Sequence, residues 1–565
     1  MKNFFGHLWS ILRFSGLTWE GRFGVLLYFV ILGLELASIP VSIRMISWTN
    51  DFYSALEAFD AEQAIYQIGV FGILIGVYAS LSLASDYLRK SLVMKWRVSM
   101  TNRLLDRWFS EKTFWRLQMG FNGVNIDNPD QRIAEDCRLF VEAFIRETQD
   151  LITSVTGLFS YIALLWSLSA FPLAFSVFGL EMEIPRYMVW AAFLYVLLAS
   201  GLTHLLGYPL KSLSFMQQRR EADFRFGLIR VRENVDAIAL AKGEDAEKRH
   251  LESRLDGIVE NWKRLIFREF LLGCFKTPYS FTILRIPLLL ALPAFFGGYV
   301  KLGGLMQLAS AFQRVVTTLS WFIFAYNRLA EFAATTSRLG RLLDGLNRVE
   351  QGLNTVSYLE NDTSSVKGDG LKLHTPEGRK LDLPEQVMLE AGEHVWISGP
   401  SGTGKSTLFK TLAGFWPCAE GNIQFPQNSR RLFMPQEPFL PTDDLKAAAC
   451  YPYPAQELSD ERLAEFLNKV NLPNLAEKFL KGEAVDIKGL SRGERQRLAF
   501  VRVLVNKPDW LFLDEATGAI DPGAEQQIFH NVREMCPDMT IIVISHRAPK
   551  GLNPVRHLDL RVAVK

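Results

Sequence analysis

The chain has 565 residues, of which 49% are hydrophobic and 22% are charged, and its formal net charge is +2. This length favours two or more domains, and the near-neutral balance gives no case for a nucleic-acid partner. The five cysteines lack CxxC spacing, which argues against a disulfide framework and against a zinc site.

The first sixteen residues, MKNFFGHLWSILRFSG, predict a short amphipathic helix. Aromatic and aliphatic side chains stand there beside Lys2 and Arg13, which is typical of a helix that lies in a membrane interface. A short helix packed on a helical bundle is an equal alternative. The stretch lacks a long apolar core and a small-residue cleavage site, so it does not resemble a signal peptide.

Six apolar stretches follow, each close to the length of about 20 residues that a transmembrane helix needs. They cover roughly 23–45, 66–88, 150–172, 187–209, 279–300 and 304–327, and the last is the most polar. Lys and Arg gather in the segments after the second and fourth stretches, whereas the turns after the first and third are acidic. This bias predicts that the chain starts inside, crosses six times and ends inside. The long inside loops, about 89–149 and 210–278, are patterned as helices running on from the membrane.

Three ionisable residues, Glu35, Arg285 and Arg314, fall inside predicted spans. Charged side chains within a membrane are costly and usually face a cavity or a partner. We therefore take them as candidates for a transport pathway, with an ion pair inside the bundle or a side chain reaching the interface as the equal alternative.

The polar stretch IDNPDQRIAEDC (126–137) predicts a helix start on the inside. Asn128 suits the N-cap, Pro129 the first helical position, and Gln131 the third position of a capping box. Asp130 in the first turn favours the positive end of the helix dipole.

The soluble half contains VWISGPSGTGKS (395–406), a short β-rich run that leads through G-x-x-x-x-G-K-S into a helical pattern. This context predicts a phosphate-binding loop, in which backbone N–H groups surround the phosphates and Lys405 reaches the β- and γ-phosphates. The hydroxyl of Ser406 would bind Mg²⁺. The candidate ATP-binding residues here are Gly399, Pro400, Ser401, Gly402, Thr403, Gly404, Lys405, Ser406 and Thr407.

Residues 509–517, DWLFLDEAT, predict a buried strand with two carboxylates at its end. Asp514 would hold Mg²⁺ through water, and Glu515 would accept the proton of the attacking water.

Four more stretches occur in the soluble half: LSRGERQRLAFVRVL (490–504), FMPQEPFLP (433–441), GAIDP (518–522) and VISHR (543–547). Together with the two motifs above, they resemble the ATP-binding-cassette (ABC) ATPases in the family's own order. The resemblance implies ATP and Mg²⁺ as cofactors, and catalytic roles for Gln436, Asp521 and His546, with Gln436 also near the metal. It further implies that Ser491 and Gly493 face ATP bound by another copy.

Two stretches depart from the family pattern, at three positions in all. Arg492 and Glu494 stand where Gly and Gln are commonest in the signature, and Thr375 stands where an aromatic residue often stacks on adenine. We leave the adenine-stacking residue unassigned.

The membrane half resembles the SbmA/BacA-like branch, which includes YddA-type proteins and, more distantly, the peroxisomal class D transporters. Stretches 48–56, 127–136, 220–244 and 319–334 carry this resemblance. It implies a six-helix all-α transmembrane domain of the type IV (exporter-like) ABC fold (1–345), a linker (346–368) and a P-loop α/β nucleotide-binding domain (369–565). It also implies that the helix begun at 128 couples the two, through Asn128, Asp130, Arg132 and Asp136, by docking near Gln436.

Three functions agree with these features. The first is ATP-driven transport, with uptake favoured, of peptides or other bulky hydrophilic solutes such as cobalamin across a bacterial inner membrane. The second is transport of fatty acids, acyl-CoA or lipids, and the third is a membrane-anchored ATPase that regulates without pumping. Each chain has one phosphate-binding loop and one signature, which predicts a homodimer with two composite ATP sites. A heterodimer with a related chain is the alternative. The distribution of Lys and Arg predicts that both termini and the ATPase domain are cytoplasmic.

Overall fold

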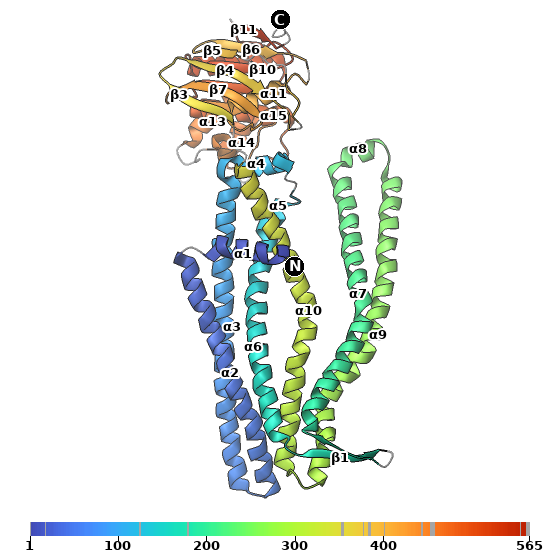
Figure 1. The fold of residues 1–565 in the computed structure, drawn as a ribbon. Coiled ribbons are helices and arrows are strands. Elements are labelled where there is room, and N and C mark those ends of the chain that lie inside the picture. The colour runs from blue at the N-terminus through green and yellow to red at the C-terminus, as the bar shows by residue number, and fades with distance from the viewer. Residues whose placement is uncertain are drawn as a thin grey trace. The chain divides into compact units, whose positions relative to one another are not determined.

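The computed structural model describes residues 2–16, 19–123, 126–177, 180–351, 355–376, 378–381, 386–400, 402–441, 444–452, 458–553 and 555–560. The chain forms two compact units (Figure 1). The first, which we call the helical unit, comprises Met1–Leu105 and Asn128–Leu343. The second, the α/β unit, comprises Asp106–Asp127 and Asp344–Lys565.

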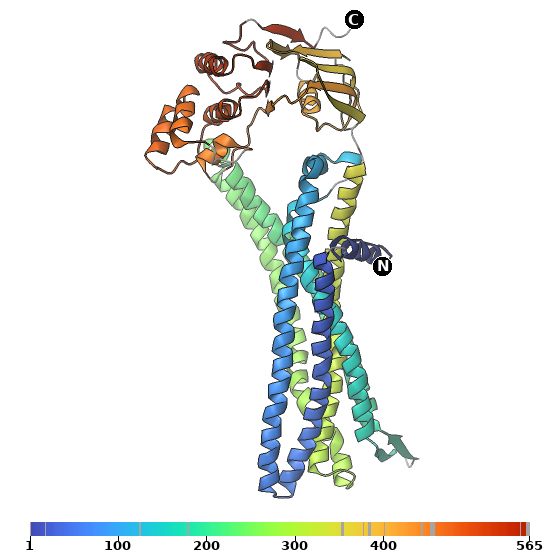
Figure 2. The same ribbon diagram turned by 90° about the vertical axis from the view of Figure 1, so that its left-hand side faces the viewer.

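Six long helices build most of the described part of the helical unit. They are α2 (Trp19–Glu57), α3 (Ala61–Phe109), α6 (Cys137–Leu168), α7 (Tyr187–Glu233), α9 (Glu244–Phe296) and α10 (Leu302–Gln351), with the end of α3 and of α10 belonging to the α/β unit. Helices α7 and α9 form a pair that diverges from the others toward the turn between them (Figures 1 and 2). Among the described residues, α2, α3, α6, α7 and α9 are long and apolar enough to cross a membrane. Five predicted spans therefore fall in such helices, and the sixth, in α10, stays a prediction.

The bundle has an apolar core to which α10 contributes fully. Leu308, Phe312 and Val315 of α10 are almost completely buried in one cluster with residues of α6, α7 and α9. Helix α10 also carries Gln313 and Arg314, which are half-buried beside these residues. Its low hydropathy thus agrees with an internal position.

The third predicted span, 150–172, is too long in the sequence-based prediction. Helix α6 ends at Leu168, and Pro172 begins a β-hairpin of β1 (Pro172–Val177) and β2 (Leu180–Pro185). The hairpin lies at the same end of the bundle as the α2–α3 turn (Figures 1 and 2). Apolar residues at 171–175 made this strand look like a continuation of the helix.

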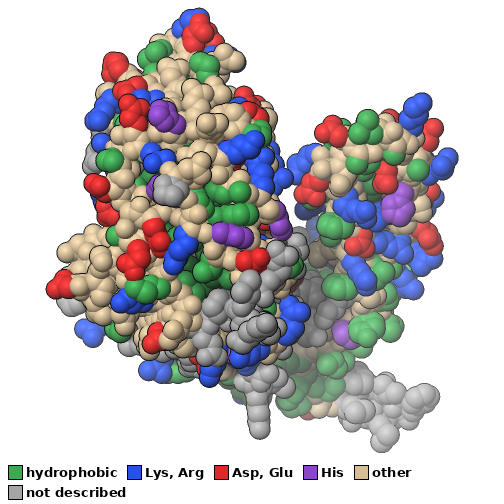
Figure 3. Space-filling view, turned by 90° about the horizontal axis from the view of Figure 1, so that it is seen from above, with side chains coloured by type: hydrophobic (Ala, Val, Ile, Leu, Met, Phe, Trp, Pro, Cys, Tyr) green, Lys and Arg blue, Asp and Glu red, His purple; other side chains and the backbone are tan. Residues whose placement is uncertain are grey.

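The predicted inside loop 210–278 is helical, as expected. Helix α7 continues to Glu233, α8 (Val235–Leu240) makes the turn, and α9 starts at Glu244. Asn261 joins the pair, because its side-chain amide donates to the Leu213 carbonyl at 3.0 Å and to Gln217 Oε1 at 2.8 Å. Charged side chains gather at the tip of this pair (Figure 3).

The N-terminal helix α1 (Lys2–Gly16) packs one face on the bundle and exposes the other. Ile11 is fully buried, the Phe4 ring lies 5.9 Å from the ring of Phe332, and Arg103 donates to the Phe14 carbonyl. Phe5 and Trp9 are exposed. The packing of α1 on the bundle is therefore confirmed, whereas its place in a membrane interface stays a prediction.

The segment at 126–137 differs from its prediction in detail. Pro129 does occupy the first helical position of the short helix α5 (Pro129–Gln131), but Asn128 adopts φ +47° and its side chain makes no capping hydrogen bond. Gln131 donates to Glu135 at 3.0 Å, so the predicted capping box is wrong. A π-helical turn, Arg132–Asp136, then leads into α6. This turn brings Asp136 into a buried position described below.

The α/β unit contains two sheets. Five parallel strands have the order β11 (Arg556–Asp559), β6 (His394–Ser398), β10 (Thr540–Ile544), β9 (Trp510–Asp514) and β8 (Arg431–Met434). A four-stranded sheet has the order β3 (Thr355–Asn361), β7 (Ala419–Pro426), β4 (Ser365–Leu373) and β5 (Gln386–Glu390). The predicted linker 346–368 is therefore not a linker, because it holds the end of α10, β3 and part of β4.

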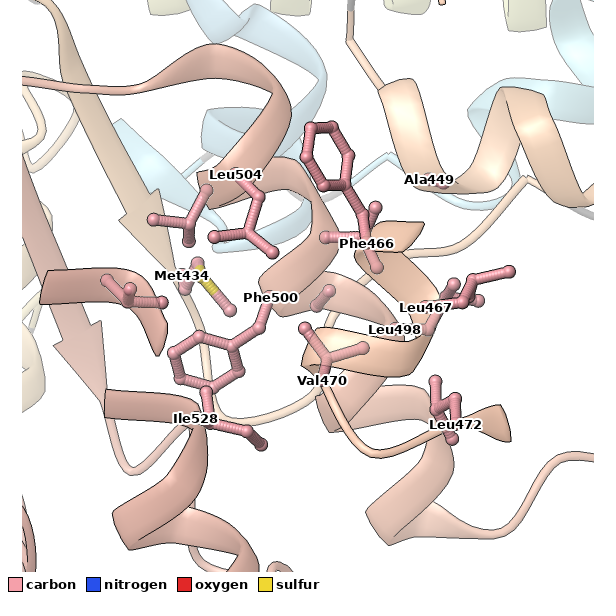
Figure 4. Packing of buried hydrophobic residues seen from close by; sticks show 14 of the residues in the cluster. Met434, Ala449, Phe466, Leu467, Val470, Leu472, Leu498, Phe500, Leu504 and Ile528 are labelled. Atoms are coloured by element: carbon pink, nitrogen blue, oxygen red, sulfur yellow. The ribbon is translucent and has the colours of Figure 1, made fainter. Parts of the chain in front are cut away.

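Six helices follow β6 in the described part of this unit, and all except α11 contribute to the larger core cluster (Figure 4), whereas α11 packs in the second cluster. They are α11 (Lys405–Leu412), α12 (Leu445–Cys450), α13 (Asp460–Lys469), α14 (Pro473–Leu480), α15 (Arg492–Asn506) and α16 (Pro522–Met535). Leu498, Phe500 and Leu504 of α15 pack among residues of β8, α13 and α16. This packing fixes the start of α15 relative to the sheet.

Candidate functional site

The predicted motifs meet at one edge of the parallel sheet. Strand β6 leads into the glycine-rich loop, Glu515 follows β9, His546 follows β10 by two residues, and Gln436 follows β8 by two residues. The strands are parallel neighbours, so their carboxyl ends lie together. Ligands of open α/β sheets bind at this edge.

The glycine-rich loop wraps around Lys405. Gly402 and Gly404 have φ of +85° and +97°, which only glycine adopts at low cost. The Lys405 ammonium donates to the carbonyls of Gly399 at 2.7 Å and Pro400 at 2.9 Å, and it is 7% exposed. Thr403 also bonds Pro400, and Thr407 lies in the first turn of α11; Ser401 falls outside the described residues.

Ser406 and Asp514 lie in contact beside this loop. Burial raises the pKa of the Asp514 carboxyl, while a hydrogen bond from the Ser406 side chain opposes the rise. A hydroxyl and a carboxylate are the ligand types that Mg²⁺ prefers, with phosphate and water oxygens completing its shell.

Glu515 is held by two of the other three predicted catalytic side chains. Gln436 Nε2 donates to Glu515 Oε2 at 2.7 Å, and His546 Nε2 lies 3.1 Å from Glu515 Oε1. The Glu515 N–H donates to the Ile544 carbonyl at 2.8 Å, and its backbone has φ +50°. A non-glycine residue in this conformation is strained, and such strain is concentrated at functional sites.

The signature residues start helix α15. Ser491 is its N-cap and forms a capping box with Glu494, whose carboxylate accepts from the Ser491 N–H at 2.9 Å and hydroxyl at 2.7 Å. These bonds lower the pKa of Glu494. Glu494 therefore has a local role at the position where the family commonly has Gln. A Cβ on Gly493 would lie 2.8 Å from the Ala519 carbonyl oxygen, so the backbones approach too closely for any larger residue.

Asp521 and Thr375 have local roles in the fold. The Asp521 carboxylate caps α16 by accepting from the N–H groups of Gly523 and Ala524 at 3.1 and 2.9 Å. The Thr375 side chain accepts from the Arg379 N–H at 3.2 Å in a tight turn. Neither contact adds a group for stacking on adenine.

Gln496 is a site residue that the sequence reasoning missed. Its buried side chain donates to the Gln436 carbonyl at 2.9 Å and accepts from the Ala519 N–H at 2.9 Å. It thereby ties helix α15 to the segments that carry Gln436 and Asp521. The only sequence signal was a glutamine among arginines on an otherwise apolar helix face.

Replacing Gln496 with alanine is expected to lower ATP hydrolysis about 10-fold and the free energy of unfolding by about 2 kcal/mol, because the Gln436 carbonyl and the Ala519 N–H each lose a hydrogen-bond partner. Steady-state hydrolysis and nucleotide binding by the purified protein would measure this. Gln527→Ala, an exposed change on α16, is the matched control. Unchanged hydrolysis in Gln496→Ala would show that the bridge is dispensable.

A second missed feature is the helix α4 (Thr113–Gln118), which folds with the α/β unit. The Lys112 ammonium donates to the Ala413 carbonyl at 3.1 Å, at the end of the loop helix α11. The Trp115 ring lies 5.0 Å from Phe415 and 5.8 Å from Trp416. A segment between two membrane spans thus packs on the helix that follows the glycine-rich loop.

Two of the four predicted coupling residues, Arg132 and Asp136, form contacts inside the helical unit. Asp136 is buried, and its carboxylate accepts from Arg338 of α10 at 2.7 and 2.9 Å and from Arg132 at 3.1 Å. The same contact raises the pKa of Arg338. Asn128 and Asp130 are exposed. All four residues belong to the helical unit, whereas α4 belongs to the α/β unit.

The helical unit contains a polar cavity of about 540 Å³ between α2, α3, α6 and α10. Glu35 and Arg314, both singled out from the sequence, line it together with Asp86, Arg89 and Asp150. Arg285 does not line it and is exposed on α9. Two of the three predicted pathway residues are therefore brought together.

A phosphate-binding loop at a parallel sheet, joined to helices able to cross a membrane, defines a membrane-embedded ATPase. Residues 14–296 match the family model described as ABC transporter transmembrane region 2, and residues 385–518 match the model described as ABC transporter. The chain belongs to the ABC transporter family, in a YddA-type group related to the class D transporters. It is therefore an ATP hydrolase coupled to transport.

The relatives match over most of the chain. It is 33% identical over 529 residues to the inner membrane ABC transporter ATP-binding protein YddA of Escherichia coli, covering 94% of this chain and 92% of that protein. It is 26% identical to ABC transporter D family member 2 of Arabidopsis thaliana, covering 92% and 80%. A bacterial Atm1-family ABC exporter with ATP bound has the same fold, with a TM-score of 0.66 at 17% identity, covering 93% and 91%.

Proposed function

We propose that two copies of this chain form an ATP-driven transporter that moves a peptide or another bulky hydrophilic solute, such as a cobalamin-like compound. The supporting observation is the charge-lined cavity in the helical unit. Charged walls within a membrane segment are costly unless they face water, a partner or a charged solute. Uptake is the direction we infer, from the likeness to the SbmA/BacA-like branch.

For the ATP cycle, we assign the general base to Glu515, which Gln436 and His546 orient. Lys405 and the loop N–H groups bind the phosphates, and Ser406, Asp514 and Gln436 would hold Mg²⁺. Bound Mg²⁺ neutralises charge that develops on the transferred phosphoryl group. Ser491, Gly493 and Asp521 serve the site completed with the other copy.

A homodimer is supported by the single loop and single signature of each chain, because C2 symmetry completes both sites at once. The tip formed by α7, α8 and α9 offers a contact surface, since Val235 and Leu240 at the ends of α8 are exposed apolar residues. Exposed apolar residues at such a tip favour a protein partner.

For location, we propose an inner membrane with six spans, α10 being the sixth, and with both termini and the ATPase domain in the cytoplasm. The name of the YddA relative and the clustering of Lys and Arg after the second and fourth spans support this. Coupling would run through Asn128, Asp130, Arg132 and Asp136 near Gln436, with α4 as the part that contacts the loop helix.

One observation favours the second candidate, a carrier of fatty acids, acyl-CoA or lipids. A further cavity of about 400 Å³ shares Ile39 with the first and is lined by Leu36, Pro40 and Ile43. Its apolar wall suits a hydrocarbon chain. The first cavity argues against this candidate, because it is lined by three carboxylates and two guanidiniums. This excess of negative charge would repel the phosphate groups of acyl-CoA.

Proteoliposome uptake with a panel of peptides, cobalamin and acyl-CoA, with and without ATP, tests the proposal. We expect a hydrophilic solute to accumulate only with ATP, and the Glu515→Gln protein to serve as the inactive control. Movement of acyl-CoA alone would favour the second candidate. If nothing moves and nothing stimulates hydrolysis, the non-pumping regulator is the better description.

A further inference from the structure

Arg314 and Glu35 line the cavity in the helical unit at two places along α2. Arg314 donates through Nε and Nη2 to the Ser42 hydroxyl at 3.1 and 2.7 Å, while Glu35 accepts from Ser85 at 3.1 Å. Glu35 and Ser42 are seven residues apart on one helix, which places them about 10 Å apart along its axis. The cavity therefore has a guanidinium end at Arg314 and a second end where carboxylates outnumber the one guanidinium, that of Arg89.

At the guanidinium end, Arg314 lacks a counter-charge. Within the part of the chain that the structure describes, its partners are the Ser42 hydroxyl and the Tyr161 ring, 5.5 Å away, and no carboxylate pairs with it. The bonds to Ser42 leave the Nη1 edge for a ligand. A half-buried guanidinium with donors to spare is a recognition group for a carboxylate.

At the other end the carboxylates are only partly compensated. Arg89 lies 3.6 Å from Glu35 but 3.0 Å from Asp86, and Asp150 is 3.5 Å from Arg328. Asp86 is also paired with Lys90 at 2.7 Å, so Glu35 has the weaker share of Arg89. Glu35 and Asp150 together offer acceptors for a ligand ammonium.

We propose that this cavity binds the two ends of a short zwitterionic peptide, with the carboxylate at Arg314 and the ammonium at Glu35 and Asp150. An extended chain spans about 3.3–3.6 Å per residue, so a tripeptide matches the separation of about 10 Å. The hydroxyls of Ser38, Thr153 and Thr318 line the space between and can bond peptide groups. This inference rests on the proposed function and specifies its substrate.

The test is the binding of trialanine to the purified full-length protein in lipid nanodiscs without ATP, by calorimetry. We expect trialanine to bind at least about 10-fold more tightly than either its C-terminal amide or its N-acetyl form, since each loses one charge-assisted bond. The Arg314→Gln protein should lose only the preference for trialanine over its C-terminal amide. The Glu35→Gln protein should lose only the preference for trialanine over its N-acetyl form. Arg285→Gln, outside the cavity, should keep both preferences.

These selectivity changes distinguish a lost ligand contact from general misfolding, which would weaken all three ligands together. Equal affinity of the wild-type protein for trialanine and its blocked forms, or no binding, would overturn the inference. So would an Arg314→Gln protein that still prefers the free carboxylate. Cobalamin uptake in proteoliposomes would then leave the proposed function standing, whereas absence of any ATP-driven uptake would remove both.

Discussion

Replacing Glu515 with glutamine is expected to slow ATP hydrolysis by about 100-fold or more while ATP binding stays intact. Glutamine fills the same space and can still contact Gln436 and His546, which lie 2.7 and 3.1 Å from the Glu515 carboxylate. It cannot accept the proton of the attacking water, so the change removes the base and keeps the site. Phosphate release and nucleotide binding, measured on the same preparation, separate the two effects.

Glu477→Gln provides the matched control for this change. Glu477 is an exposed carboxylate of α14 that pairs with Lys481 at 2.6 Å, away from the sheet edge. Hydrolysis by this variant should equal that of the wild-type protein. Near-normal hydrolysis by Glu515→Gln would remove Glu515 from the role of base and leave His546 as the next residue to examine.

Replacing Asp136 with alanine is expected to reduce transport more than basal ATP hydrolysis and to lower stability by about 2 kcal/mol. Breaking a buried ion pair costs about 3–5 kcal/mol, and we discount this because the Arg338 side chain is 34% exposed. The carboxylate ties the start of α6 to α10, so its loss leaves two guanidiniums facing each other. Uptake, hydrolysis and the apparent Tm of the same preparation would measure these effects.

Arg132→Ala should act in the same direction but less strongly, because Arg338 still holds Asp136. Glu142→Ala on α6 is the control, since Glu142 pairs only with Arg138 at the surface of the described part of the chain. Equal loss of transport and hydrolysis, or loss of neither, would count against a coupling role for this joint.

The nucleotide-binding residues could be predicted because their signals are local. The glycine spacing around Lys405 and the strand before Asp514 each sit within about ten residues, and the parallel strands then carry their ends to one edge. The convergence of Gln436 and His546 on Glu515 follows from that geometry. The sequence shows that Glu494 departs from the glutamine common in the family. Its capping hydrogen bonds with Ser491 are seen only in the structure.

The contacts that could not be predicted from the sequence are those between segments far apart in the chain. Asp136 and Arg338 are 202 residues apart, and their pairing accompanies a π-helical turn in place of the expected capping box. Here a tertiary contact outweighs local helix-capping preferences, which contribute only about 1 kcal/mol. The cavity likewise depends on how four helices pack, which the sequence does not show. Two of its residues, Glu35 and Arg314, could still be predicted because they are charged residues inside predicted spans.

The docking of α4 has a consequence for how the protein is made. Lys112 and its partner Ala413 are 301 residues apart, and translation proceeds from the N-terminus. While the chain grows on the ribosome, Trp115 and Phe121 therefore lack their contacts with Phe415 and Trp416 until those residues have been synthesised. A chain that stops before Asp344 would keep this aromatic patch bare, because all its partners in the α/β unit come later. The segment around α4 is thus covered only by residues made in the last third of synthesis, and a fragment cut between the halves would expose its aromatic side chains.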